Sequence, residues 1–221
     1  MIPAAGNHEV ESAQFFGNFA LPGDGPYAET FGSFDVGNAH VVYVDDESIG
    51  TLPDSDAAKA QLAWVDQDLA RADAKRAARP FVVVDHHRGD FSTSDNGSAP
   101  DVVAIRRALV PMFQAHHVDL VIGGHDHEYE RTKPLGGTAD APSAQATGPT
   151  YVVCAGAGAD AFGIGTSPVD YRVLNVAFGK GTSYVGVYAI LTLDGKTLSW
   201  KAFGLKAGGG DDVIDTFSLT R

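Results

Sequence analysis

Strand-like and helix-like segments alternate through the middle of the chain, and this order restricts the fold more than any other feature. Residues 40–44, 81–84 and 118–122 are short, mainly apolar runs, as expected of buried strands. Residues 54–78 and 101–116 separate these runs and carry apolar side chains at helical spacing. Successive strands joined by helical crossovers lie parallel in one sheet. The sequence therefore predicts an α/β arrangement around a parallel sheet.

The flanking parts of the chain predict hairpins instead of crossovers. Gly37-Asn38 is a turn signal between strands at 31–36 and 39–45, and Asp194-Gly195 is another between strands at 183–193 and 197–204. We also predict strands at 151–155 and 214–219, and an exposed loop at 136–149, which is rich in glycine and proline. We therefore expect an antiparallel sheet stacked on the first sheet. The predicted fold class is α/β (α+β), a layered sandwich of two mixed β-sheets flanked by helices.

Length and charge limit the classes of partner. The chain has 221 residues, which we interpret as a single domain spanning residues 1–221. Its formal net charge of −12 argues against a nucleic-acid backbone or an anionic membrane as partner, whereas a small anionic substrate stays compatible if a metal ion supplies positive charge. The one cysteine, Cys154, excludes a disulfide within the chain and leaves the compartment open.

Polar clusters follow three of the apolar runs. Gly6-Asn7-His8-Glu9 follows residues 2–5, Asp85-His86-His87 follows residues 81–84, and Gly124-His125-Asp126-His127 follows residues 118–122. Functional residues of parallel sheets lie at the carboxyl ends of the strands, so we expect His86 and His125 in one crevice. Imidazole is the commonest protein ligand for transition metals. A metal site is therefore predicted, with a solvated loop as the alternative for the two histidines of the third cluster.

Together the clusters resemble those of the metallophosphoesterases (the calcineurin-like superfamily), and among these the purple acid phosphatases. The motifs that carry the resemblance are Gly-Asn-His-Glu at 6–9, the strand-end histidine and Gly-His-x-His-x-Tyr-Glu-Arg at 124–131, in the order of the family. Asp215-Thr216-Phe217 is similar to the family's terminal Asp-Ser-Phe. The resemblance implies the metallophosphoesterase fold and metal-dependent hydrolysis of a small phosphoester.

The resemblance also implies the metal ligands. Asn7, His86 and His125 would bind one ion. His127 would bind the other ion, which is ferric in purple phosphatases. The implied cofactors are two metal ions, Fe paired with Zn, Mn or Fe, and the mixed nitrogen and oxygen ligands do not choose among them.

Two further roles follow from the same resemblance. His8 would be catalytic and would protonate the leaving oxygen, a contribution of about 10²–10⁴-fold for a positioned imidazole. His87 would bind substrate. Two cations would neutralise a phosphomonoester and lower the pKa of a bound water, which then attacks in line.

The chain holds three of the five motifs of the family. An aspartate motif and Gly-Asp-x-x-Tyr lie upstream of Gly-Asn-His-Glu in that family, and neither occurs in this sequence at the corresponding place. We therefore expect the C-terminal portion of a longer enzyme, with an N-terminally incomplete fold and with His127 as the remaining ligand of the first metal. Two alternatives stay open: a catalytically silent metal-binding remnant, or a phosphodiesterase that uses the same core. Such family members are often exported, but the chain itself does not decide the compartment.

Overall fold

The computed structural model describes residues 4–9, 12–22, 29–156, 159–160, 164–166, 168–179 and 181–221. A mixed sheet forms its centre, with the strand order β1-β2-β3-β4-β8-β5-β9. The strands β2, β3, β4 and β8 run parallel, while β1, β5 and β9 are antiparallel to their neighbours. The bounds of this sheet are β1 Gly32–Val36, β2 Ala39–Val44, β3 Phe81–Arg88, β4 Leu120–Gly124, β5 Glu128–Thr132, β8 Thr150–Cys154 and β9 Arg172–Ala177.

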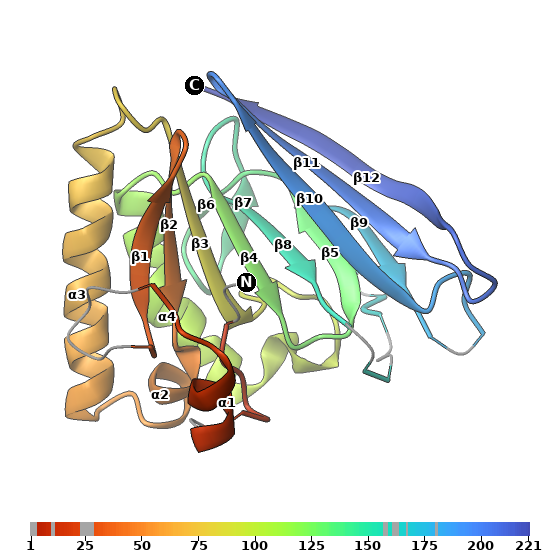
Figure 1. Cartoon of the computed structure of the whole chain (residues 1–221), viewed down its shortest axis with the longest axis horizontal. Helices are drawn as coiled ribbons and strands as arrows, with labels where there is room; N and C mark the ends of the chain where they lie inside the picture. Colours follow the sequence, from red (N-terminus) through yellow and green to blue (C-terminus); the bar gives the residue numbers. More distant parts are fainter. Residues whose placement is uncertain are drawn as a thin grey trace.

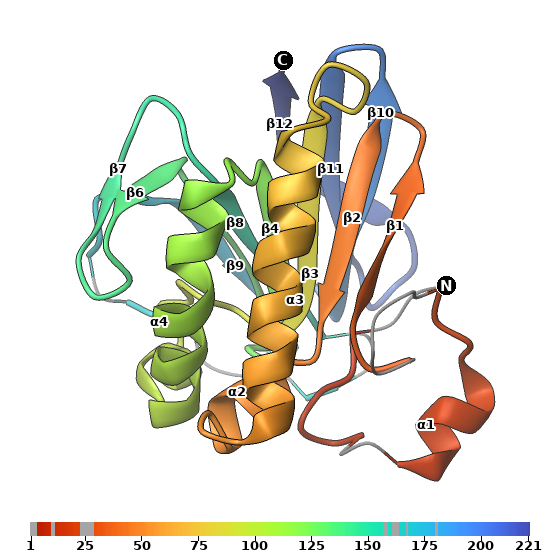
Figure 2. The ribbon, with the colours of Figure 1, turned by 90° about the vertical axis from the view of Figure 1, so that its left-hand side faces the viewer.

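Helices cover one face of this sheet, and a second sheet covers part of the other (Figures 1 and 2). The second sheet is antiparallel, in the order β10-β11-β12. The remaining bounds are α1 Ala13–Asn18, α2 Asp46–Thr51, α3 Asp56–Asp73, the short 3-10 helix η1 Asp95–Ser98, α4 Pro100–Ala115, β6 Leu135–Gly137, β7 Pro142–Ala144, β10 Gly186–Asp194, β11 Thr197–Leu205 and β12 Asp211–Thr220. The predicted layered sandwich is confirmed.

Four details differ from the sequence prediction. The strand expected at 151–155 belongs to the central sheet as β8, parallel to β4, and not to the antiparallel sheet. The loop expected at 136–149 contains the small β6–β7 hairpin. The helix expected at 54–78 is α3, which begins after the Ser55 cap, whose hydroxyl accepts from the Ala58 amide at 3.1 Å, and ends at Asp73. The second sheet is wholly antiparallel and not mixed.

Alternate side chains of the central strands pack into two separate cores. Val82 and Val84 of β3 face the helices and pack with residues of α3 and α4 such as Leu69 and Phe113. Phe81 and Val83 face the second sheet. Because both faces are covered, β3 is apolar at every position from 81 to 84, as in other parallel sheets.

A buried polar cluster joins the two sheets. The Tyr129 hydroxyl of β5 donates to Asp215 of β12 at 2.6 Å, and Arg131 donates to both oxygens of the same carboxylate at 2.5 and 2.9 Å. The Trp200 indole donates to the Tyr129 hydroxyl at 3.0 Å. The Tyr-Glu-Arg segment of the third motif thus supplies two of its residues to a structural link.

His40 of β2 joins the outer hairpin to α3. Its two ring nitrogens lie 2.8 Å from the carboxylates of Asp35 in β1 and Asp68 in α3. Burial alone would lower the pKa of His40, but the hydrogen bonds to Asp68 and Asp35 outweigh it and raise that pKa. No helix in the described part of the chain is long and apolar enough to span a membrane.

Candidate metal centre

The Gly-Asn-His-Glu segment forms a turn that closes on itself. The amide of Gly6 donates to the carboxylate of Glu9 at 3.0 Å, and the amide of Glu9 donates to the carbonyl of Gly6 at 3.0 Å. The first of these bonds explains why the segment ends in glutamate. The turn presents the Asn7 side chain toward the end of β3, and His8 is exposed in the same turn.

Three side chains converge beside this turn. The Nε2 atom of His87 lies 2.9 Å from Oδ1 of Asn7 and 3.2 Å from Nδ1 of His125. A Cβ atom added to Gly6 would lie 2.5 Å from the His87 ring, so only glycine lets the turn approach this imidazole. The cluster therefore unites a turn near the start of the chain with the ends of β3 and β4.

His125 occupies this position through an uncommon backbone conformation. Its backbone φ of 66° lies in the left-handed region, which residues other than glycine adopt in only a small share of cases. It comes directly after β4, and the glycine pair before it lets β4 lie close to β3, since a Cβ atom on Gly123 would lie 2.9 Å from the carbonyl oxygen of Arg88. Backbone of this kind is concentrated at functional sites.

His86 was predicted as the strand-end ligand, and the structure places it elsewhere. Its side chain is 1% exposed, with Nδ1 at 3.0 Å from Asp46 and Nε2 at 3.3 Å from Asp90. Carboxylates only accept, so both ring nitrogens carry protons and neither has a lone pair to give to a metal. His87, which was predicted to bind substrate, occupies the place beside Asn7 and His125.

The alternation of β3 explains this exchange. The strand runs on to Arg88, beyond the expected end at residue 84. His86 is therefore in phase with Val82 and Val84 and points into the helix layer, where its ring lies 6.2 Å from that of Phe113. The β3–β4 pairing also shifts register between Asp85 and Arg88, a bulge-like irregularity of the kind that re-aims side chains near functional sites.

Asp46, the first residue of α2, holds both neighbours of His87 and was missed by the sequence analysis. Its Oδ2 accepts from the His86 ring at 3.0 Å and from the Arg88 amide at 2.6 Å, and its Oδ1 accepts from the Arg88 guanidinium at 3.0 Å. The signal was available, because Asp45-Asp46-Glu47 follows the apolar strand β2, whose carboxyl end meets the same edge of the sheet.

The two adjacent histidines, His86 and His87, have opposite pKa shifts. Burial lowers the pKa of His87 to about 4, and burial likewise lowers the pKa of His125. For His86, burial alone would lower the pKa, but Asp90 and Asp46 outweigh it and raise that pKa to about 10. At neutral pH His87 and His125 are therefore neutral imidazoles with a lone pair, whereas His86 is an imidazolium within a buried ion pair.

His127 lies two residues beyond His125. Its Nδ1 contacts the backbone carbonyl oxygen of Asp160. Because a carbonyl only accepts, Nδ1 carries the proton and the lone pair resides on Nε2, the tautomer that a metal-binding imidazole adopts when a carbonyl orients it. Asp126 between the two histidines is buried and accepts from the Asn96 amide at 2.8 Å.

Two glutamates of the third motif lie buried behind these histidines. Glu128 accepts from Ser92 at 3.4 Å, and Glu130 accepts from the Thr93 amide and hydroxyl at 2.9 and 3.0 Å. Burial raises the pKa of both carboxyls, and for Glu128 the negative charge of Glu130 raises it further. The pKa of Glu128 rises to about 9, so Glu128 is protonated at neutral pH and the two acidic residues do not both carry charge there.

The donor set of the cluster fits one metal ion. Two neutral imidazole nitrogens and an amide oxygen suit Zn²⁺, Fe and Mn²⁺. Donors that share an ion at about 2.1 Å lie about 3 Å apart. His87 Nε2 lies at such a distance from each of the other two atoms, 2.9 Å from Asn7 Oδ1 and 3.2 Å from His125 Nδ1. Within the described residues, no group of three or more His, Cys, Asp or Glu side chains is arranged to hold a metal ion, so the amide of Asn7 is essential to this assignment.

Comparison with known proteins identifies the family of the chain. The family model of calcineurin-like phosphoesterases matches residues 1–129. Human acid phosphatase type 7 is 27% identical over 175 residues, which cover 70% of this chain and 39% of that protein. Purple acid phosphatase 18 of Arabidopsis thaliana is 31% identical over 138 residues, which cover 58% of this chain and 30% of that protein.

The structural comparison gives the same result for the fold. Purple acid phosphatase PPD1 from yellow lupin (Lupinus luteus) seeds superimposes with a TM-score of 0.69 at 20% identity, over 92% of this chain and 34% of that chain. The chain thus spans about a third of the length of these relatives. Since the family model covers more than half of its residues, this chain belongs to the calcineurin-like phosphoesterases and is similar to the purple acid phosphatases among them.

Proposed function

We propose that the chain belongs to a metal-dependent phosphomonoester hydrolase. In this proposal it supplies the ligands of one of the two ions in the metal centre. The observation that carries this proposal is the position of His87 Nε2, which lies 2.9 Å from Asn7 Oδ1 and 3.2 Å from His125 Nδ1, in a chain of the calcineurin-like phosphoesterase family. Family membership supports phosphoester hydrolysis, and the cluster supports a metal ion as the source of positive charge. Such an ion supplies Lewis acidity toward the phosphoryl oxygens and lowers the pKa of a bound water.

The chain's own residues prepare this site in two ways. Burial keeps His87 and His125 neutral, so ion binding at neutral pH needs no imidazolium to be deprotonated. In His87 the proton that Nε2 donates to Asn7 Oδ1 would move to Nδ1, which leaves the lone pair on Nε2 for the ion. Asp46 binds the ring of His86 and the backbone amide of Arg88, the residues on either side of His87, so the imidazole is held in place before an ion arrives. Ligands held in advance bind more tightly because less conformational entropy is lost on binding.

His8 is the proposed proton donor. It is exposed in the turn that carries Asn7, directly beside the proposed metal ligand. A leaving alkoxide needs a proton, and an imidazole in this position can deliver it to the oxygen on the solvent side of the substrate. His8 makes no contribution to holding the ion in this proposal.

His127 is a proposed ligand of a second ion. With that ion the centre would be binuclear, and the metals would be Fe, Zn or Mn. Its orientation by the Asp160 carbonyl gives it the tautomer needed for this role. Further ligands for that ion are absent from the described residues. We therefore propose that one ion binds to this chain with Asn7, His87 and His125, and that His127 contributes to a site completed by residues other than those of the cluster.

The test combines metal binding with turnover. Metal-stripped protein is titrated with Zn²⁺ and Mn²⁺, and hydrolysis of p-nitrophenyl phosphate is followed before and after addition of a chelator. We expect one ion per chain, activity that depends on it, and loss of both in His87→Ala. His8→Ala should keep the ion and lose turnover, which separates the proton donor from the ligands.

Other outcomes distinguish the alternatives. Binding of an ion without turnover of any phosphoester would identify a metal-binding but catalytically silent chain. Faster turnover of bis(p-nitrophenyl) phosphate than of the monoester would identify a phosphodiesterase. If His87→Ala binds the ion as tightly as the unaltered protein, the proposed site is wrong.

A further inference from the structure

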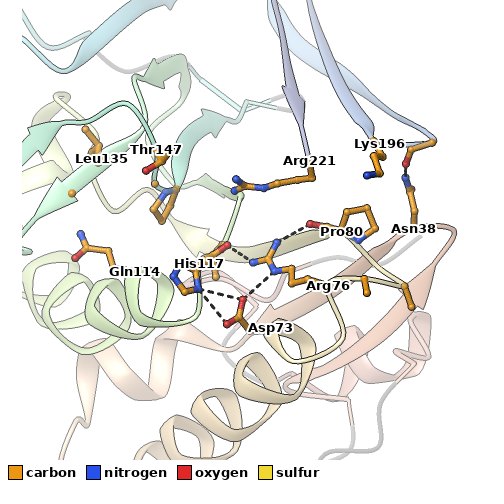
Figure 3. A pocket seen from close by; sticks show the side chains of 17 residues that line it. Asn38, Asp73, Arg76, Pro80, Gln114, His117, Leu135, Thr147, Lys196 and Arg221 are labelled. Atoms are coloured by element: carbon orange, nitrogen blue, oxygen red, sulfur yellow. Dashed lines mark hydrogen bonds and ion pairs between the residues drawn. The ribbon is translucent and has the colours of Figure 1, made fainter.

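A large cavity lies at the opposite edge of the central sheet from the metal cluster. It has a volume of about 900 Å³ and opens where β3 and β4 begin, whereas His87 and His125 lie where these strands end. Figure 3 shows Asp73, Arg76 and His117 on one side of it and Lys196 and Arg221 on the other. Its volume is typical of sites for small organic ligands, which occupy about 300–1,000 Å³.

The charge of the cavity contrasts with that of the chain. The chain has 28 acidic and 16 Lys and Arg residues, whereas the cavity is lined by Arg76, Lys196 and Arg221 and by a single acidic side chain, Asp73. Asp119 below the lining binds both guanidiniums, and with Asp73 and the terminal carboxylate of Arg221 three carboxylates balance the three cations. The cavity is therefore close to neutral in a chain of net charge −12, and it repels an anion less than the remaining surface does.

The cations on the two sides of the cavity differ in how many hydrogen-bond and ion-pair partners they already have. Arg76 is engaged at every nitrogen, by Asp73, by Asp119 and by backbone carbonyls of residues 80, 116 and 117. Arg221 binds Asp119 through Nε and Nη2 only. Lys196 is exposed in the β10–β11 turn and forms no ion pair with any described residue. Lys196 and the outer edge of Arg221 are thus the groups that can receive an anion.

The remaining lining suits the body of an organic molecule. Aliphatic and backbone surfaces form most of it, namely Ala77, Ala78, Pro80, Val118, Leu135, Gly136, Gly148 and Pro149. Gln114 of α4 also lines the cavity, and its amide nitrogen is buried without a hydrogen-bond partner. An unpaired buried donor costs about 1–3 kcal/mol, and a ligand oxygen at this place would satisfy it.

We propose that this cavity binds a small organic acid, an apolar body with a carboxylate or sulfonate group. The anionic group pairs with Lys196 and Arg221, and the apolar body packs between Pro80, Leu135 and Pro149. A polar atom at the far end accepts from Gln114. The site is separate from the metal cluster, so its occupation does not compete with a phosphoester.

The test uses 8-anilinonaphthalene-1-sulfonate as the probe, in metal-stripped protein, and follows the rise of its fluorescence on binding. We expect saturable binding at one site per chain. Lys196→Glu should weaken the affinity at least about tenfold, because it replaces the receiving cation by a repelling charge. The matched control is Lys201→Glu, which makes the same charge change at a lysine outside the cavity, beside Phe203, and should leave the affinity unchanged.

A second variant tests the cavity by shape instead of charge. Thr147 is exposed at the rim, so Thr147→Trp fills the cavity without disturbing the core, and it should abolish binding at this site, whereas Thr147→Ser should retain it. Competition identifies the ligand class: 2-naphthoate should displace the probe, and inorganic phosphate in millimolar excess should not.

The proposal is overturned if the probe binds equally to Lys196→Glu and Lys201→Glu, or if Thr147→Trp leaves its affinity unchanged. Displacement by inorganic phosphate would contradict the apolar part of the ligand. Because these measurements need no metal and no turnover, they succeed or fail independently of the proposed phosphatase activity.

Discussion

Asp46→Asn is the substitution that tests most sharply how His87 is held in place. The carboxylate is fully buried and makes three contacts, with the His86 ring, the Arg88 amide and the Arg88 guanidinium, at 3.0, 2.6 and 3.0 Å. Burial alone would raise the pKa of Asp46, but His86 and Arg88 outweigh it and lower that pKa, so the group is ionised. Asparagine keeps the shape and removes the charge.

The expected cost follows from burial. Removing one partner of a buried ion pair costs about 3–5 kcal/mol. We expect the lower end of this range, because Asp90 still pairs with His86, and Glu47 and Asp101 still pair with Arg88. For a chain of this size that free energy lowers the midpoint of thermal unfolding by about 10 °C. Loss of the contacts that hold His87 should also weaken metal affinity by about 10–100-fold, as is typical of residues that orient a metal ligand.

A matched control is available on the next residue of the same helix. Glu47 binds the same Arg88 nitrogen at 2.6 Å, but its side chain is 18% exposed and does not contact the His86 ring or the Arg88 amide. Glu47→Gln should therefore cost about 1 kcal/mol or less and leave metal affinity unchanged. Urea unfolding of the metal-free proteins and titration with Zn²⁺ measure the two effects. Equal losses in both variants would refute the reasoning.

Three further predictions concern other parts of the fold. Gly6→Ala places a Cβ atom 2.5 Å from the His87 ring and should weaken metal affinity at least about tenfold, while Gly17→Ala, with open space around its Cβ atom, should stabilise the helix by about 0.5–1 kcal/mol. Asp215→Asn breaks the link between the sheets and should cost about 3 kcal/mol in urea unfolding. The pKa of His40 is raised above its ordinary 6.5, so the stability it contributes is complete below that pH and is lost as the pH rises through the raised value. The difference in unfolding free energy between the unaltered protein and His40→Gln should shrink as the pH rises above 6.5 and through the raised pKa; a constant difference would contradict it.

Elements with a clear local pattern were predictable from the sequence. The alternation of strands and amphipathic helices predicted the central sheet and its covering helices, and Asp194-Gly195 predicted the β10–β11 hairpin. Residue 195 has a φ of +54°, which glycine adopts without strain, so the signal rested on a real backbone requirement. Patterns of this kind depend on a few residues that are neighbours in the sequence. Contacts with distant segments therefore do not change them.

Placement of strands within sheets was less predictable. β8 has the length and composition of any buried strand, and nothing in its sequence states that it pairs parallel with β4. The six residues of α2 are too few to show helical periodicity, so the helix that carries Asp46 was missed. These features depend on contacts between distant segments.

The sequence also does not decide which of His86 and His87 faces the metal cluster. Phe81, Val82, Val83 and Val84 are all buried, so the apolar pattern gives no indication of which alternate residues face the helices. A shift of one residue moves a side chain to the opposite face of a strand. The strand-end rule thus pointed to two adjacent histidines, and only the neighbouring layers of the fold decide which of them faces Asn7 and His125.

Anomalous X-ray scattering from crystals loaded with Zn²⁺ is the measurement that tests the proposed metal centre most directly. The proposal predicts a peak bounded by Asn7 Oδ1, His87 Nε2 and His125 Nδ1, with His86 still paired to Asp46 and Asp90. A peak bounded by His86, or the absence of any peak beside His87 and His125 at saturating metal, would contradict it.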